Sequence, residues 1–139
     1  MNDKFFNLAH EKQQYILAAA IKEFALQGYD KASTDIITSS AGISKGSLFN
    51  YFTNKLNLYL YVLEYVMMKI SSEELEEIQK IQESDFYDRF KRISIIKHEM
   101  FMRYPQETRI IAAFFMSPSK SVDGSFEKLK KYYESKKTI

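Results

Sequence analysis

The stretch from residue 33 to residue 55 combines small hydroxyl side chains, amides and lysines, which hydrogen-bond to anions and to base edges. Thr34 and Ser44 fall where short helices begin, and the backbone amides at a helix N-terminus bind phosphate. Lys45 can donate to a phosphate or to a guanine edge. Gly46 lets a helix approach a partner closely because it has no side chain. These features predict a surface that contacts DNA.

The predicted surface lies along the rim of one short helix and extends to the start of the next. Contacts of this kind, mostly to the sugar-phosphate backbone, are the commonest ones in protein–DNA interfaces. The predicted DNA-binding residues are Thr34, Ser44, Lys45, Gly46, Ser47, Phe49, Asn50, Tyr51 and Lys55.

Few other residues could carry chemistry. Glu99 follows His98, but the second histidine, His10, lies in the terminal segment, and a metal or acid–base site needs more ligands at fixed spacing. The sequence has no cysteine, no glycine-rich phosphate loop and no nucleophile–base pair. We therefore expect no enzyme activity, no metal and no cofactor.

An amphipathic first helix is predicted over about 10–27, because apolar residues at positions 16, 17, 20, 21, 24 and 25 share one face. Gly28 is expected to supply a left-handed C-cap, with Tyr29 folding back onto the helix end. With the two helices that follow, this helix forms a unit that needs an apolar core. The predicted core residues are Ile21, Phe24, Ile36, Ile37, Leu48 and Phe52.

Two short helices follow the first. Ser33 or Thr34 is the predicted N-cap of the second helix. The pair Ala41-Gly42 ends that helix in a tight turn, for which glycine supplies a positive φ. Ser44 then caps the third helix. Two short capped helices joined by such a turn are typical of a helix-turn-helix.

Longer helices are predicted beyond residue 54. Asn54 caps a helix that keeps its apolar period to about residue 78. A break near residues 84–85 precedes a fifth helix to about residue 104, and Pro105 suits the first turn of a sixth. A final amphipathic helix is expected over about 125–136. Since no strand alternation occurs, the predicted fold class is all-α.

The run Ala-Gly-Ile-Ser-Lys-Gly-Ser-Leu-Phe-Asn-Tyr-Phe over residues 41–52, followed by Asn54-Lys55, resembles the N-terminal domain of the TetR family of transcriptional regulators. Phe24, Gly28-Tyr29 and Ser33-Thr34 extend this resemblance, which covers about residues 11–60. It implies a helix-turn-helix DNA-binding domain over 1–57. Over 58–139 it implies a helical effector-binding and dimerisation domain, which we expect to be incomplete at its C-terminal end.

Two residues depart from the family pattern. Phe49 stands where the family often has a tyrosine whose hydroxyl can meet a phosphate, so that contact is not expected here. Thr38 stands where alanine is usual, and its hydroxyl is expected to bond back to the carbonyl four residues earlier.

Methionines and aromatic rings in the second half suit an adaptable apolar pocket, and they equally suit a helical core or a dimer face. By the resemblance, a pocket for an unidentified small-molecule effector is expected there. The candidate lining residues are Tyr61, Tyr65, Met68, Met100, Phe101, Tyr104, Phe114 and Phe115.

The resemblance implies a cytoplasmic homodimer that represses transcription from a palindromic double-stranded DNA operator and is released by its effector. An activator of the same fold is the alternative. No apolar run approaches the roughly 18 residues of a membrane span, so no membrane partner is expected. Residues 1–60 hold six lysines against five acidic residues, a net charge of only +1. This low charge, with Phe49, leaves open a helical protein-interaction module that has lost DNA binding.

Overall fold

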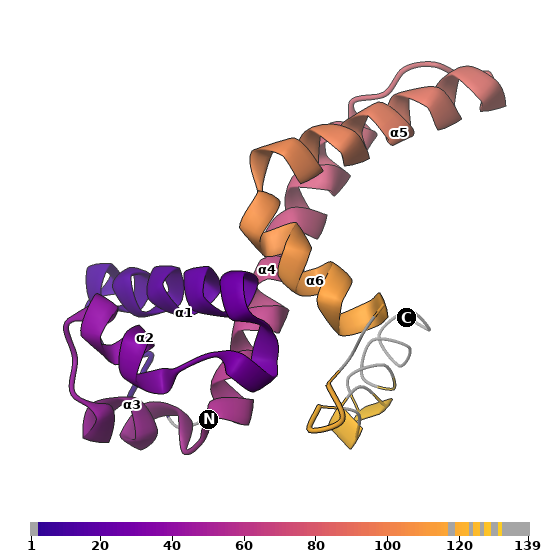
Figure 1. The fold of residues 1–139 in the computed structure, drawn as a ribbon. Coiled ribbons are helices and arrows are strands. Elements are labelled where there is room, and N and C mark those ends of the chain that lie inside the picture. Colours follow the sequence, from indigo (N-terminus) through magenta and orange to yellow (C-terminus); the bar gives the residue numbers. More distant parts are fainter. Residues whose placement is uncertain (1–2, 117–118, 123, 126, 129–130, 132–139) are drawn as a thin grey trace.

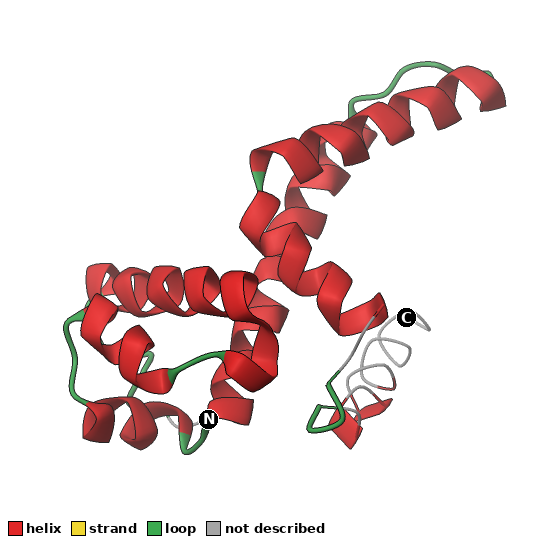
Figure 2. Cartoon of the chain, viewed as in Figure 1, coloured by secondary structure: helices red, strands yellow, loops and turns green. Residues whose placement is uncertain are grey.

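The computed structural model describes residues 3–116, 119–122, 124–125, 127–128 and 131. Its helices confirm the all-α class, and no strand occurs within these residues (Figures 1 and 2). The predicted helix over 125–136 falls largely outside the described residues. Within them, no helix is long and apolar enough to cross a membrane. The helices are α1 (His10–Lys31), α2 (Thr34–Ala41), α3 (Lys45–Phe52), α4 (Lys55–Gln79), α5 (Phe86–Arg103) and α6 (Pro105–Met116).

Gly28 interrupts α1 near the position where the first helix was predicted to end. Its φ of 74° is positive, as expected for glycine, but its ψ of 174° is extended rather than left-handed helical. The chain therefore kinks and makes one further turn, which the amide of Ala32 closes by donating to the Gly28 carbonyl at 3.1 Å. The Tyr29 ring stacks on Phe24 with 6.4 Å between centroids, as predicted.

The caps of the two short helices lie at positions that the sequence predicted. The Ser33 hydroxyl accepts from the amide of Ile36 at 3.3 Å, so Ser33 and not Thr34 is the cap of α2. Gly42 ends α2 in the left-handed region, with φ 70° and ψ 31°. The Thr38 hydroxyl donates to the carbonyl of Asp35 at 3.0 Å, which lies three residues back and not four as predicted.

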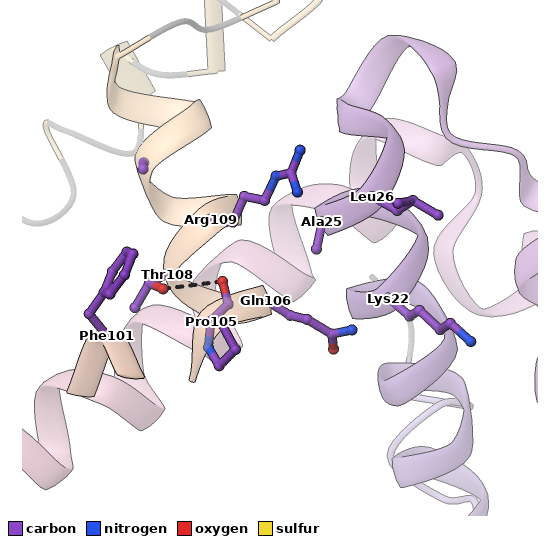
Figure 3. A pocket seen from close by; sticks show the side chains of 9 residues that line it. Lys22, Ala25, Leu26, Phe101, Pro105, Gln106, Thr108 and Arg109 are labelled. Atoms are coloured by element: carbon purple, nitrogen blue, oxygen red, sulfur yellow. Dashed lines mark hydrogen bonds between the residues drawn. The ribbon is translucent and has the colours of Figure 1, made fainter. Parts of the chain in front are cut away.

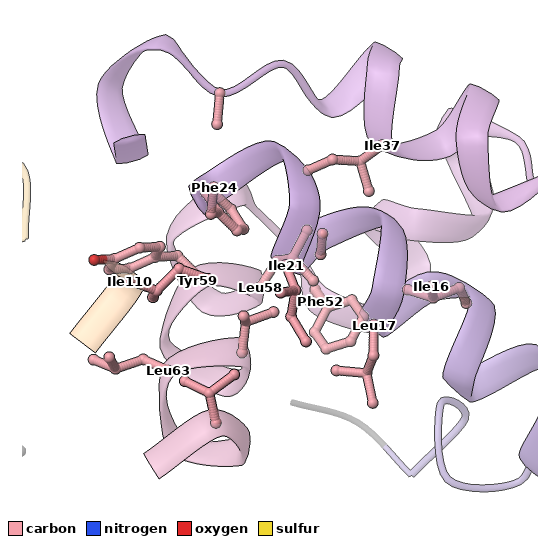
Figure 4. Close-up of a cluster of buried hydrophobic side chains, with 14 of the residues drawn as sticks. Ile16, Leu17, Ile21, Phe24, Ile37, Phe52, Leu58, Tyr59, Leu63 and Ile110 are labelled. Carbon is pink, nitrogen blue, oxygen red and sulfur yellow. The ribbon is translucent and has the colours of Figure 1, made fainter. Parts of the chain in front are cut away.

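The core of this three-helix unit continues directly into α4 and α6 (Figure 4). Most of the predicted core residues are buried, but Ile36 is 52% exposed. Of the two isoleucines only Ile37 points into the core, where Thr38 is buried beside it. Leu58, on α4, and Ile110, on α6, belong to the same buried cluster, so the core crosses the predicted domain boundary at residue 57.

The junction between α3 and α4 is a tight turn on Thr53, which has φ 71° and ψ −49°. The amide of Asn54 donates to the carbonyl of Phe52 at 2.8 Å, closing a γ-turn in a strained backbone conformation. Asn54 then caps α4, accepting from the amide of Asn57 at 2.8 Å. The start of α4 is therefore fixed directly to the end of α3.

The second half of α4 and the antiparallel α5 form a hairpin that projects away from the three-helix unit, and α6 returns to pack on α1 and α4 (Figure 1). Glu73, on α4, accepts from Tyr104 at 2.5 Å and pairs with Arg103 at 3.3 Å. Farther out, Lys97 pairs with Glu74 at 3.4 Å. Polar contacts thus join the two helices of the hairpin.

Candidate nucleic-acid interface

The N-terminal turn of α3 lies on the surface of the helix-turn-helix. The Ser44 hydroxyl accepts from the amide of Ser47 at 3.1 Å and lies 2.9 Å from the Ser47 hydroxyl. The first-turn amides of a helix have no partner within the helix. Those of Lys45 and Gly46 therefore remain at an exposed helix start, where they can bind an anion.

Gly46 is not required by the packing of the protein itself. A methyl group built at its position would meet only the Ser44 hydroxyl, at an ordinary contact distance of 3.9 Å. Its backbone is helical and needs no positive φ. The absence of a side chain therefore leaves room for a partner outside the protein rather than relieving a clash inside it.

The Lys45 ammonium group lies near two other side chains of the protein, those of Asp35 and Phe49. Its Nζ is 3.0 Å from a carboxylate oxygen of Asp35, and both side chains are more than half exposed. The same Nζ lies 6.0 Å from the centre of the Phe49 ring. An exposed ion pair of this kind contributes at most about 1 kcal/mol, so a phosphate could replace Asp35 at little cost.

The C-terminal half of α3 contacts a segment that the sequence reasoning missed. The Asn50 side chain accepts a hydrogen bond from Lys4 at 3.2 Å. Tyr51 is half-buried and packs against Phe5, with 6.3 Å between ring centroids. Phe5, Phe6 and Leu8 form a small apolar cluster, which was the available signal, but no helical period marked it.

One of the predicted contact residues, Lys55, also holds the unit together. Lys55 donates to the carbonyls of Asp30 and Ala32 at 3.3 and 3.4 Å and lies 4.6 Å from the centre of the Tyr29 ring. It thereby satisfies carbonyls at the end of α1. Thr34 is the first residue of α2 and is half-buried.

Glu23 is a second residue that the sequence reasoning missed. It lies on the apolar face of α1 and is buried, and its carboxylate accepts from the backbone amide of Ser33 at 3.0 Å. An acidic residue within a predicted apolar face was the signal. Glu23 ties α1 to the start of α2 and therefore positions the helix-turn-helix.

The eight predicted effector-pocket residues do not line one cavity. Met100 and Phe114 are buried in the protein, and Phe115 is half exposed. Tyr104 is engaged by Glu73, and this hydrogen bond raises the pKa of the Tyr104 hydroxyl. The other four residues lie in two separate grooves.

The first groove, of about 440 Å³, runs along α4. Burial raises the pKa of the Tyr61 hydroxyl, and the neighbouring Tyr65 and Glu64 raise it further, so this phenol is neutral at physiological pH. The groove is lined by Phe6, Tyr61, Glu64, Tyr65, Met68, Lys69 and Ser72.

The second groove, of about 520 Å³, lies between α1 and α6 and includes Phe101 (Figure 3). Lys22 and Leu26 flank it on α1, while Gln106 and Arg109 project from α6 toward that helix. Its nine lining residues contain two cations and no carboxylate. In the part of the chain that the structure describes, no three acidic or histidine side chains come together as a metal site would require.

Comparison with known proteins identifies relatives of the region that contains this surface. Residues 16–62 match the family described as "Bacterial regulatory proteins, tetR family". The HTH-type transcriptional activator FasR of Mycolicibacterium smegmatis is 43% identical over 54 residues, which are 39% of this chain and 25% of that protein. The HTH-type transcriptional regulator RutR of Escherichia coli K12 is 30% identical over 105 residues, which cover 71% of this chain and 45% of RutR.

A solved structure extends the similarity to the arrangement of the helices. The crystal structure of a TetR family transcriptional regulator from Chloroflexus aurantiacus J-10-fl matches with a TM-score of 0.75 and 26% sequence identity. The match covers 96% of this chain and 65% of that one. The chain spans less than half the length of FasR and of RutR.

Proposed function

The chain belongs to the TetR family of bacterial regulatory proteins, and on that premise we propose that it regulates transcription by binding duplex DNA through α3. One observation carries the proposal. The N-terminal turn of α3 presents Ser44, Lys45 and Gly46 to solvent, while Leu48 and Phe52 anchor the helix in the core. The helix is thus held rigidly with its polar side outward.

In this function α3 enters the major groove and its first turn faces the sugar-phosphate backbone. The amides of Lys45 and Gly46 bind a phosphate oxygen, and the missing side chain at residue 46 allows the close approach. Ser47 and Asn50 lie farther along the helix and can hydrogen-bond to base edges. A homodimer would place two such helices in successive major grooves, about 34 Å apart, on a palindromic operator.

Asp35 limits the affinity of this surface for DNA. Its carboxylate neutralises Lys45 in the free protein, and it would face the phosphates that Lys45 approaches. Binding therefore requires Lys45 to exchange Asp35 for a phosphate. This exchange reduces binding to arbitrary DNA, so that base contacts contribute a larger share of the total affinity.

Repression follows if the operator overlaps a promoter, and release follows if an effector favours a state with misplaced recognition helices. The groove between α1 and α6 is a candidate effector site, because a ligand there touches the DNA-binding unit and the following helices together (Figure 3). Such a ligand shifts the equilibrium only by its difference in affinity between the two states.

The test is to select from a pool of random duplex DNA with the full chain and to measure binding of the recovered sequence over a range of salt concentrations. Recovery of an inverted repeat, with binding that weakens steeply as salt rises, supports the proposal. Failure of the folded protein to enrich any sequence contradicts it.

Variants on the recovered sequence then locate the surface. Lys45→Ala should weaken binding about equally on all duplexes and reduce the slope of log affinity against log salt by about 1, because it removes a phosphate contact, whereas Lys91→Ala on the exposed face of α5 should leave affinity unchanged. Asp35→Asn should strengthen binding to unrelated DNA several-fold, because the competing charge is removed. Equal loss from Lys45→Ala and Lys91→Ala would place the contact surface elsewhere.

A further inference from the structure

The N-terminal segment, residues 3–8, is packed against α3 and α4 beside the recognition surface. We propose that it is part of the DNA-contacting unit, with Lys4 a phosphate contact and Phe5 the residue that positions it. This proposal rests on the proposed binding of DNA by α3. It assigns a role to residues outside the matched region 16–62.

Phe5 anchors the segment. Its side chain is fully buried, with the rings of Phe52 and Tyr61 at 4.9 and 5.3 Å between centroids. Phe52 belongs to α3 and Tyr61 to α4, so one side chain of the segment packs against both helices on either side of the γ-turn. Returning this buried ring to water would cost free energy, so its burial keeps the segment in place.

Backbone contacts hold the segment on both sides of Phe5. The amides of Asn7 and Leu8 donate to the carbonyls of Asp3 and Phe5, each at 3.1 Å, which curls the segment into a turn. The side-chain amide of Gln13, on α1, donates to the carbonyls of Phe6 and Leu8 at 3.2 and 3.0 Å. The segment is thus fixed to the three-helix unit and is not an independent tail.

Lys4 places a positive charge beside the C-terminal half of α3. Its Nζ donates to Asn50 at 3.2 Å, and both side chains are exposed. The carbonyls at a helix C-terminus carry partial negative charge, which repels phosphate, and a cation there offsets that repulsion. Lys45 lies at the other end of α3. The two lysines thus place one positive charge near each end of α3, where each can meet a backbone phosphate of bound DNA.

The first experiment measures the dependence of DNA affinity on salt for Lys4→Gln, using the full chain and a duplex of the selected sequence. Loss of one phosphate contact should reduce the slope of log affinity against log salt by about 0.9, with roughly tenfold weaker binding at low salt. The thermal midpoint should not change, because Lys4 is exposed. Lys91→Gln, which removes the same charge from α5, should leave the slope at the wild-type value.

The second experiment tests whether Phe5 acts by positioning Lys4. Phe5→Ala, measured below its unfolding temperature, should reduce the salt slope by the same amount as Lys4→Gln, and the double variant should show no further reduction. Phe90→Ala, which removes a 62% exposed ring from α5, is the control and should keep the slope. If Phe5→Ala does not fold, Phe5→Leu combined with Lys4→Gln gives the same double-mutant comparison.

The outcomes separate this proposal from the proposed function. A wild-type slope in Lys4→Gln, together with salt-dependent binding by the wild-type protein, overturns the role of the segment and leaves α3 as the DNA-binding helix. A reduced slope in Lys4→Gln that Phe5 variants do not share overturns the positioning role. Absence of DNA binding by the wild-type protein overturns both proposals.

Discussion

The three-helix unit with the first half of α4, and the hairpin formed by the second half of α4 with α5, are both helical but are stabilised differently. The first is organised around a continuous buried cluster that includes Phe5, Phe52 and Leu58. In α5, by contrast, only Ile96 and Met100 are buried among eighteen residues. The difference teaches that an amphipathic pattern predicts a helix but not how firmly that helix is held.

The contrast has a functional side. The proposed DNA-contacting surface of α3 lies on the firmly packed unit, where the positions of α3 and the N-terminal segment are set by buried aromatic rings. The hairpin is joined by Glu73 with Arg103 and by Glu74 with Lys97, exposed pairs of small individual strength. The two regions should therefore respond differently to matched substitutions.

The largest difference is expected from removing one phenylalanine ring in each region. Phe52→Ala should lower the free energy of unfolding by about 3–5 kcal/mol, because it opens a cavity in the core. Phe90→Ala, at a ring that is 62% exposed on α5, should change it by less than about 0.5 kcal/mol. Urea unfolding followed by circular dichroism measures both. Similar losses in the two variants would show that the hairpin is as well packed as the core.

Matched helix caps sharpen the same comparison. Asn54 caps α4 and Asp85 caps α5, each accepting from an amide three residues later. Asn54→Ala should lower global stability by about 1 kcal/mol. Asp85→Ala should instead speed hydrogen exchange only in the first turns of α5, because those turns open without unfolding the core. Faster hydrogen exchange in α1 as well would show that the hairpin and the core unfold together.

Relieving backbone strain within the packed unit should raise its stability. Thr53 has a positive φ, which residues other than glycine rarely adopt. Thr53→Gly should raise the free energy of unfolding by about 1 kcal/mol, because relief of strain exceeds the added chain entropy of glycine. Thermal unfolding of the two proteins measures the change. A lower midpoint for Thr53→Gly would mean that the threonine side chain contributes more than the strain costs.

The smallest expected effect on stability is the pH-dependent contribution of Glu73 to the hairpin. Hydrogen bonding by Tyr104, aided by Arg103, holds the pKa of the Glu73 carboxyl below its usual range. A lowered carboxyl pKa stabilises the folded hairpin above the unfolded-state pKa, and this contribution is lost as pH falls through the lowered value. Carbon-13 NMR titration of Glu73 should show the lowered midpoint, and Tyr104→Phe should raise it. An unchanged midpoint in Tyr104→Phe would assign the shift to Arg103.

Features that depend on neighbouring residues were predictable from the sequence. Ser44, Asn54 and Pro105 mark helix starts because capping and proline geometry are local. The positive φ at Gly42 follows in the same way. For the same reason the start of α3 and its capped first turn could be predicted from the sequence.

Features that depend on distant contacts were not predictable. Burial of Phe5 arises from rings on α3 and α4, at least 46 residues away in sequence, and no period marks a single phenylalanine as a core residue. The candidate effector residues shared a chemical character, but whether Tyr61 and Phe101 line one pocket depends on how α4 and α6 cross. Composition can therefore suggest an adaptable pocket without locating it.

The continuity of α4 has a mechanical consequence. Its 25 residues make a rod about 37 Å long, with α3 fixed to one end through a turn that has no slack and α5 beside the other end. A tilt of about 5° about one end displaces the other by roughly 3 Å, given that length. A small rotation of α4 at the hairpin end would thus become a displacement at the α3 end, and the stiffness of α4 determines how faithfully it is transmitted.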